Sequence, residues 1–356
     1  AYANVENAYG NNLATLQASR DKSIDSINKQ LNESQLQYDI KENELLSKDT
    51  FEQLIQAPNF EKVAEILAPT VYGKYLGKDF QHDFEKSLNQ ELVQTYGELI
   101  EIIPNPSLIW LYTMRYTIHN LKVLTKADKI KENYDYLFIP DGFFTIDELK
   151  AAIETGESST LPVSVVKSIQ EVRDYFEESR ILQGIDVIYD RFYLSEQYHL
   201  AKSLKDEAIL QAIVATIDLK NIMTTARCLL QKRSYAFMSA VISEYGSIDK
   251  ELLLDFSTRP LSELIEFLLQ SDYRDLIGPA LSSEEIDFSR LSVLTDNYLT
   301  TILQVAQTQA FGPLPLLAFL NAKDIEVMNL RLIIVGKRSG FTKEAIYERM
   351  RTLYDL

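Results

Sequence analysis

Cysteine, histidine and tryptophan are scarce in this chain, and each shortage excludes a kind of site. The 356 residues include one cysteine, Cys228, three histidines and one tryptophan. A single cysteine cannot form an intramolecular disulfide, which fits a reducing compartment. Cys228 lies in an apolar helical stretch, and we interpret it as a small core side chain. The histidines (His82, His119 and His199) lie far apart without a cluster of other ligands, so we expect no metal site.

Long apolar runs and an excess of basic charge are also absent. No stretch approaches the roughly 20 apolar residues that a membrane-spanning helix needs, and no basic start followed by an apolar run indicates a signal peptide. The formal net charge is −16 and the isoelectric point is near 4.8. These values argue against a nucleic-acid partner and against adhesion to anionic lipid. We therefore expect a cytoplasmic protein that reaches a membrane only through a protein partner.

Motifs for catalysis and cofactor binding are missing as well. There is no nucleophile elbow for a serine or cysteine triad. The segment Gly336–Gly340 resembles a phosphate loop, but it lacks the first glycine of that motif and has Arg338 after its lysine. We interpret it as a helix end, where basic residues offset the dipole and glycine ends the helix. Most of the 52 Asp and Glu residues are expected to face solvent on amphipathic helices, so we expect no catalytic residue and no cofactor.

Apolar residues at intervals of three and four recur through most of the chain. The stretch 80–103 is a strong amphipathic signal, and no sustained period-two alternation occurs. Capping residues mark three expected helix starts, at Ser47, at Thr145 with Glu148, and at Ser282 with Glu285. We therefore predict an all-α fold.

One apolar helical pattern occurs three times, roughly every 100 residues. Each copy contains an asparagine, Asn120, Asn221 or Asn329, and the strongest copy is Lys323–Gly336. Asparagine is a mediocre helix former, so three equivalent occurrences indicate a shared task. We interpret it as a hydrogen bond that ties the helix to a neighbour within its module, with a partner contact as the alternative. A second echo relates the segment from Leu261 to Tyr273 to the segment from Phe51 to Gly73.

The repeat divides the chain into a polar N-terminal segment and three related helical modules. The segment covers residues 1–45, and the modules cover 46–140, 141–245 and 246–356. The apolar positions of the N-terminal segment, such as Leu13, are too sparse to face a large core. We interpret the segment as an exposed or frayed helix. The alternative is a coiled-coil arm for a partner helix, although its heptads are poor.

Sequence stretches near both ends of the modules resemble a known family. They are LLSKDTFEQLI, followed by FEKVAEILAPTVYG, and the ending EVMNLRLIIVGKRSGFTKEAIYERM. They resemble the central-stalk socket of V/A-type rotary ATPases, called the C subunit in bacteria and archaea and the d subunit in the eukaryotic enzyme. The resemblance covers about residues 40–356, is looser in the middle, and is closer to the prokaryotic branch. Residues 1–40 depart from the family pattern.

The resemblance implies a pseudo-threefold, all-helical funnel without catalytic residues. Such a funnel sits on the cytoplasmic mouth of the membrane-embedded proteolipid ring and receives the lower end of the coiled-coil axle. It transmits torque between ATP hydrolysis or synthesis and proton or sodium transport through the ring. The implied partners are the axle subunits and the ring, at the cytoplasmic face of the membrane. The acidic charge would suit a basic axle end or basic ring loops, which predicts salt-sensitive assembly.

Two other functions remain as alternatives to this resemblance. One is a soluble helical-repeat scaffold unrelated to ATPases, and the other is a helical enzyme with an acidic site that the sequence does not mark. The candidates for partner contact are the basic residues Lys337 and Arg338. We expect reversal of their charge to weaken assembly and to leave the fold intact.

Overall fold

The computed structural model describes residues 2–103, 105–304 and 313–353. In the first helix it describes the side chains of residues 11–26, 29, 39 and 41 onward. Within these residues the regular structure is helical, apart from one isolated antiparallel bridge between Leu281 and Ile286. The prediction of an all-α fold is confirmed for this part of the chain.

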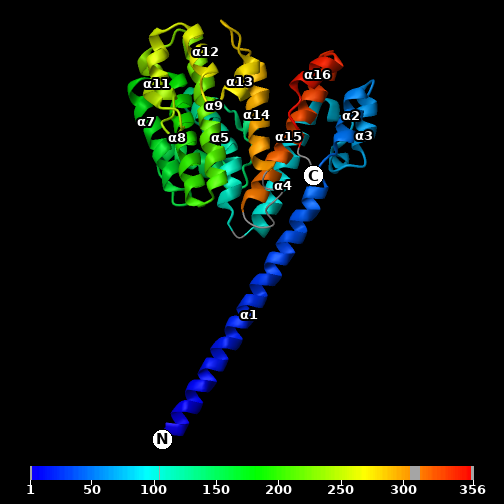
Figure 1. Ribbon diagram of the computed structural model, residues 1–356, viewed down its shortest axis with the longest axis vertical. Helices are drawn as coiled ribbons and strands as arrows, with labels where there is room; N and C mark the ends of the chain where they lie inside the picture. The colour runs from blue at the N-terminus through cyan, green and yellow to red at the C-terminus, as the bar shows by residue number, and fades with distance from the viewer. Residues whose placement is uncertain (1, 104, 305–312, 354–356) are drawn as a thin grey trace.

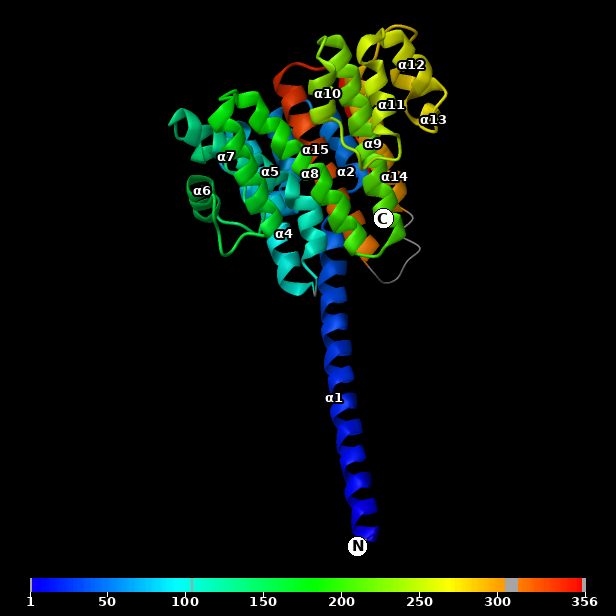
Figure 2. The same cartoon turned by 90° about the vertical axis from the view of Figure 1, so that its left-hand side faces the viewer.

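Helix α1 (Tyr2–Asn43) is a single long helix that projects away from the body of the molecule (Figures 1 and 2). A helix of 42 residues is about 60 Å long, at about 1.5 Å per residue. Leu13, Leu16 and Ile24 are 51%, 68% and 42% exposed. The apolar stripe of this helix therefore lies in solvent over its described side chains.

Six long helices in three consecutive pairs form the body. They are α4 (Phe80–Ile102) with α5 (Ser107–Ile130), α8 (Leu182–Ser203) with α9 (Glu207–Leu230), and α14 (Phe288–Gln304) with α15 (Pro313–Arg338). The α4–α5 and α8–α9 turns lie at the end of the body toward which α1 points (Figure 1). The second helix of each pair runs away from that end, and α15 leads to α16 (Lys343–Arg349) at the opposite end.

The long helices contact one another in a closed order. The second helix of each pair packs on the first helix of the next pair, so α5 packs on α8, α9 packs on α14, and α15 packs back on α4. In the last of these contacts Arg331 Nε lies 2.7 Å from Glu85 Oε2, which is 246 positions away. The chain therefore closes on itself. This order supports the implied threefold arrangement, which stays a prediction.

Shorter helices connect the long ones. They are α2 (Lys48–Gln56), α3 (Phe60–Leu67), η1 (Val71–Tyr75), η2 (Asp135–Leu137), α6 (Ile146–Thr155), α7 (Val163–Glu178), α10 (Tyr235–Val241), α11 (Lys250–Leu254), η3 (Asp255–Thr258), α12 (Leu261–Leu269), α13 (Arg274–Ile277) and η4 (Gly278–Ala280). Two of the expected helix starts are confirmed. Ser47 accepts from Thr50 N at the start of α2, and Thr145 forms a capping box with Glu148 at the start of α6.

The third expected helix start, at Ser282, is wrong. Ser282 Oγ does accept from Glu285 N at 3.1 Å, but Ser282 N donates to the backbone oxygen of Glu285 at 2.9 Å. This pairing makes a turn and not a first helical turn. The next helix, α14, begins at Phe288. Asp287 caps this helix, because its side chain accepts a hydrogen bond from Arg290 N at 2.9 Å.

The largest core joins the beginning of the described body to its end. Phe51, Leu54 and Tyr72 from the first short helices pack in one cluster with Leu330 of α15 and Ile346 of α16. All five are at most 2% exposed, and burying a side chain of this size contributes about 1.5–3 kcal/mol. The short helices of residues 48–75 are therefore fixed to the C-terminal helices. No helix in the described residues combines the length and the apolar character needed to cross a membrane.

Candidate functional site

The three repeated asparagines make the same pair of hydrogen bonds. In each case the side-chain amide donates to the carbonyl oxygen of a residue 19 or 22 positions downstream, and the side-chain oxygen accepts from the N–H of that residue. The partners are Ile139 (2.6 and 2.8 Å) for Asn120, Ser243 (2.9 and 2.9 Å) for Asn221, and Arg351 (3.0 and 2.9 Å) for Asn329. All three asparagines are at most 1% exposed. We call each pair of bonds a clasp, and α5, α9 and α15 the clasp helices.

A residue in the left-handed conformation ends each clasp helix at the same position. Lys131, Lys232 and Gly340 stand 11 residues after their asparagines and have φ angles of 59°, 54° and 72°. The next N–H then donates to the carbonyl five residues earlier, in the pairs Glu132–Ala127, Arg233–Cys228 and Phe341–Gly336. This is the Schellman helix end. The interpretation of Gly336–Gly340 as a helix end is confirmed.

The residue before each clasped residue also has the same backbone in all three copies. The φ and ψ angles are −63° and 131° at Phe138, −83° and 128° at Ile242, and −62° and 133° at Met350. These residues follow η2, α10 and α16. Each copy therefore has a long helix, a left-handed residue, a short helix, an extended residue and a clasp. This shared order of structural elements supports the proposal of three related modules.

In two copies an acid three residues before the asparagine binds a tyrosine. Tyr72 OH donates to Glu326 Oε1 and Tyr273 OH donates to Asp218 Oδ2, both at 2.6 Å. Each tyrosine lies at or next to the end of its segment of the sequence echo. Tyr72, however, is 254 positions before Glu326. The short helices of residues 48–75 therefore complete the surroundings of Asn329, at the other end of the chain.

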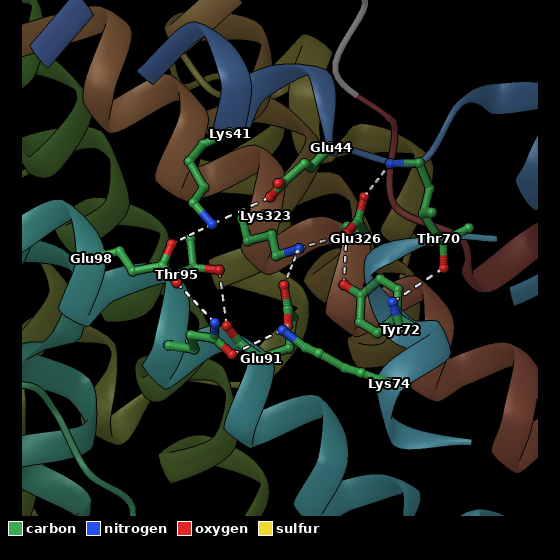
Figure 3. A network of polar contacts seen from close by, with 12 residues as sticks. Lys41, Glu44, Thr70, Tyr72, Lys74, Glu91, Thr95, Glu98, Lys323 and Glu326 are labelled. Atoms are coloured by element: carbon green, nitrogen blue, oxygen red, sulfur yellow. Dashed lines mark hydrogen bonds and ion pairs between the residues drawn. The ribbon is translucent and has the colours of Figure 1, made fainter. Parts of the chain in front are cut away.

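Helices α4 and α15 enclose a group of buried charges (Figure 3). Lys323, Glu326 and Glu91 are 3%, 2% and 3% exposed. Lys323 Nζ lies 3.1 Å from Glu326 Oε1 and 3.4 Å from Glu91 Oε1. Glu91 Oε2 accepts from Tyr75 OH at 2.9 Å and lies 3.0 Å from Lys74 Nζ. The buried carboxylates of Glu91 and Glu326 therefore share the buried ammonium of Lys323. The half-exposed Lys74 places a second positive charge beside Glu91.

Glu326 also holds the segment that follows α1. Its Oε2 accepts from Leu46 N at 2.5 Å, while its Oε1 accepts from Tyr72 OH. Burial, together with the charge of Glu326, raises the pKa of Tyr72 well above its ordinary value, so this hydroxyl keeps its proton and remains a donor. Removal of the carboxylate would leave these donors unpaired in the interior, which is costly.

A second ion pair, between the partly exposed Arg115 and the buried Asp324, fixes α5 against α15. Arg115 binds Asp324 with two nitrogens, Nη1 to Oδ2 and Nη2 to Oδ1, both at 2.5 Å. Tyr112 OH donates to Asn321 Oδ1 at 3.0 Å beside it. Burial opposes the charge of Arg115, but Asp324, Tyr96 and Tyr116 together outweigh burial and raise the pKa of Arg115. A two-pronged pair of this kind is strong and directional, so it sets the register between the two helices.

Several carboxylates are exceptions to the expectation that most acidic residues face solvent. Glu91, Asp141, Asp218, Asp324 and Glu326 are all at most 8% exposed. They can be buried because hydrogen bonds and ion pairs compensate the loss of solvent. The sequence did contain a signal, since Lys-Asp-Ile-Glu at 323–326 puts three charges inside an otherwise apolar helix.

The two candidates for partner contact have different surroundings. Lys337 Nζ donates to the carbonyl oxygens of Ile55 and Ala57, at 2.9 and 2.5 Å, where α2 ends. Burial lowers the pKa of Lys337. Arg338 is exposed and lies over the ring of Phe84, 5.6 Å from its centre. Lys337 therefore ties α15 to α2, and a reversed charge would face two carbonyl oxygens. Arg338 keeps the exposed position that a partner contact needs.

The base of α1 is attached through Lys41. Its ammonium pairs with Glu98 on α4 and with Glu44, the latter at 3.3 Å (Figure 3). Burial opposes the charge, but the two carboxylates outweigh it and raise the pKa of Lys41. All three side chains are partly exposed, and such pairs contribute only about 0.2–1 kcal/mol each. The attachment of α1 is therefore much weaker than the packing of the clasp helices.

The histidines and the cysteine are dispersed. His119 Nε2 lies 2.9 Å from the carbonyl oxygen of Leu137, and His199 Nε2 lies 3.3 Å from Tyr245 OH. Cys228 is 4% exposed and lies in the core. Across residues 2–103, 105–304 and 313–353, no group of His, Cys, Asp and Glu is placed to hold a metal ion.

Known proteins match almost the whole body of the molecule. The family model of the ATP synthase (C/AC39) subunit matches residues 39–349. The chain is 52% identical over 316 residues to the C subunit of the V-type sodium ATPase of Enterococcus hirae, with 89% of this chain and 96% of the relative covered. It is 24% identical to the C subunit of the A-type ATP synthase of Methanocaldococcus jannaschii, over 86% of this chain and 82% of that one. For the same protein of Methanosarcina barkeri the identity is 26%, over 78% of each chain.

Proposed function

The chain belongs to the family of ATP synthase (C/AC39) subunits, and on that premise we propose that it joins the axle of a V/A-type ATPase to the proteolipid ring. Members of this family are structural subunits of the rotary machine and are not catalytic by themselves. The scaffold unrelated to ATPases and the helical enzyme are therefore dropped as alternatives. Torque passes through the body between the ATP-hydrolysing or ATP-synthesising head and the ion-conducting ring.

The observation that carries this proposal is the closed order of long helices fastened by buried polar pairs. A coupling between two rotating parts has to keep its shape while torque passes through it. Sliding α15 past α4 or α5 would separate Lys323 from Glu91 and Arg115 from Asp324. Leaving one partner of a buried pair such as Lys323 and Glu91 unpaired costs about 3–5 kcal/mol. The body therefore resists shear between its helices, which suits a mechanical task.

The proposal places one partner at each end of the body. One end has the α4–α5 and α8–α9 turns, and the other has the short helices that follow the clasp helices (Figures 1 and 2). The protein is peripheral and reaches the cytoplasmic face of the membrane through the ring. Charged contacts at both ends would make assembly sensitive to salt.

Reconstitution from purified components tests this function. The full chain is mixed with detergent-solubilised ring and with axle subunits, and the complexes are isolated by size exclusion and viewed by electron microscopy. We expect a cap on one face of the ring that recruits the axle, and no axle on the ring when the chain is omitted. Rings that stay bare, or that recruit the axle equally well without the chain, would contradict the proposal. Ring binding that does not change between low and high salt would contradict its electrostatic part.

A further inference from the structure

The turns that follow the clasp helices collect positive charge on an acidic molecule. The chain as a whole has a net charge of −16. Each of these turns nevertheless has two basic residues, namely Lys129 and Lys131, Lys232 and Arg233, and Lys337 and Arg338. We call the three segments 129–131, 232–233 and 337–338 the basic turns. Because the clasp helices run away from the α1 end, the basic turns lie at the opposite end of the body (Figures 1 and 2).

One cation in every basic turn is exposed. The side chain of Lys131 is 80% exposed, although its Nζ lies 3.4 Å from Asp128 Oδ1, and Lys232 and Arg338 are also exposed. The other basic residues have roles within the fold. Lys337 binds two backbone carbonyl oxygens, and Lys129 Nζ lies 5.3 Å from the centre of the Phe176 ring. The surface therefore presents one exposed charge per copy.

Helix stability does not explain the two exposed lysines. Cations in the last turn of a helix offset its dipole, which accounts for Lys129 and Arg338. Lys131 and Lys232 come after the helix end and have φ angles of 59° and 54°. This left-handed conformation favours glycine, and Gly340 has it in the third copy. The helix dipole therefore does not account for Lys131 and Lys232, and Lys205, outside the basic turns, shares their conformation with a φ angle of 54°.

Exposed aromatic residues accompany the basic turns. Tyr136 in η2, Tyr235 in α10 and Tyr347 in α16 are 77%, 50% and 41% exposed. Aromatic residues and arginine are enriched where proteins bind one another. In each of the three copies an exposed tyrosine therefore follows the exposed cation within nine residues of the chain.

We infer that the basic turns form a repeated docking surface for a partner that presents carboxylates at intervals around an axis, namely the loop face of the proteolipid ring. This inference rests on the proposed function. A ring of identical subunits offers the same group at successive positions, so the three turns can bind simultaneously and reinforce one another. A coiled-coil axle does not offer three equivalent positions. The inference also predicts Asp or Glu on the ring loops, because exposed cations need complementary charge.

The test compares two triple variants of the full chain. The first is Lys131→Gln with Lys232→Gln and Arg338→Gln. The matched control is Lys62→Gln with Lys205→Gln and Arg274→Gln, which removes three exposed cations outside the basic turns. Lys205 also has a left-handed backbone, with a φ angle of 54°, so the control includes a lysine of the same conformation. Thermal unfolding of each variant checks that it is folded.

Binding to detergent-solubilised ring is measured over a range of salt concentrations. We expect the first variant to bind roughly tenfold more weakly than the wild type at low salt, with a shallower salt dependence, because three exposed charge pairs are lost. The control variant should bind as the wild type does. If both variants matched the wild type, the inference would be wrong even though the proposed function stood. A wild-type chain that did not bind the ring would overturn the proposed function itself.

Two further arms separate other anionic partners. In one arm, binding of the same variants to purified axle subunits is measured. Loss of axle binding with intact ring binding would overturn the inference and assign the basic turns to the axle. In the other arm, vesicles of anionic phospholipid without protein are used. Wild-type binding to these vesicles that the first variant loses, together with unchanged ring binding, would overturn the inference in favour of lipid.

Discussion

Helices α1 and α15 are both long, but different forces stabilise them. The 42 residues of α1 expose apolar side chains such as Leu13 and Leu16. Most of the 26 residues of α15 are buried, from Leu314 to Gly336. Isolated helices need more than about 12–15 residues to form in water, and α1 exceeds that length without a core. Its length and its backbone hydrogen bonds therefore stabilise α1, whereas packing against neighbouring helices stabilises α15.

The charged side chains of the two helices also differ in how far they are exposed to solvent. Asp21 and Asp25 of α1 are exposed and solvated, and Lys323, Asp324 and Glu326 of α15 are at most 8% exposed. A solvated charge has little effect on the stability of the fold, whereas a buried one depends on its partners. Matched substitutions in the two helices should therefore have very different effects.

The largest difference is expected for the acidic residues. Glu326→Ala removes the acceptor of Leu46 N and Tyr72 OH and leaves Lys323 with Glu91 alone. We expect a loss of about 3–5 kcal/mol in the free energy of unfolding, because breaking a buried ion pair leaves a charge unpaired. Urea unfolding followed by circular dichroism measures the loss.

The control for this prediction is Asp21→Ala in α1, which should change the free energy of unfolding by less than about 0.5 kcal/mol. A second variant, Glu326→Gln, keeps an acceptor and should fall between Glu326→Ala and the wild type. Equal stability of Glu326→Ala and Asp21→Ala would show that the buried charges of α15 do not hold the body together.

The next difference concerns leucines. Leu330 is 1% exposed and packs in the core that joins both ends of the chain, whereas Leu16 is 68% exposed. We expect Leu330→Ala to cost about 2–5 kcal/mol, through lost burial and the cavity that remains. Leu16→Ala should be neutral or slightly stabilising, since alanine is the best helix former. Calorimetric unfolding temperatures compare the two. A clear loss with Leu16→Ala would mean that α1 packs on something in solution.

The sequence predicted the all-α fold because helical spacing and helix caps are local patterns. Helical spacing, the cap at Ser47 and the capping box at Thr145 are encoded within a few residues, and the structure has them. The error at Ser282 was also local, because the same side-chain bond occurs in a turn. Asp287, five residues later, caps the helix that follows.

The sequence could not predict which segments close the body. Tyr72 and Glu326 are 254 positions apart, and no local pattern connects them. The echo between the Tyr72 and Tyr273 segments was visible, but it did not show that Tyr72 belongs beside Asn329. The buried role of Lys337 was missed for the same reason, since its partners, Ile55 and Ala57, are at the other end of the chain.

Asparagine provides a third pair of substitutions, with a smaller expected effect. Asn329→Ala removes both bonds to Arg351 and should cost about 2 kcal/mol, since each bond contributes about 0.5–1.5 kcal/mol. Asn12→Ala, at an exposed position of α1, should be neutral or slightly stabilising because alanine favours helix. Hydrogen exchange of the Arg351 amide measures the clasp directly. An amide that stays protected in Asn329→Ala would show that the clasp is dispensable.

The smallest effect is expected at the left-handed residue after each clasp helix, which is a glycine after α15 and a lysine after α5 and α9. Gly340 takes the left-handed position after α15, and Lys131 takes it after α5. Lys131→Gly relieves about 1 kcal/mol of backbone strain but adds about 0.4–1 kcal/mol of entropy to the unfolded chain. We therefore expect a net gain of a few tenths of a kcal/mol at most. Lys131→Gln distinguishes the effect of the charge from that of the backbone conformation, because it removes the ammonium group and keeps a strained side-chain-bearing residue at this position. If the lysine serves a partner, both variants should bind the ring more weakly, and only the glycine variant should be as stable as the wild type or more so.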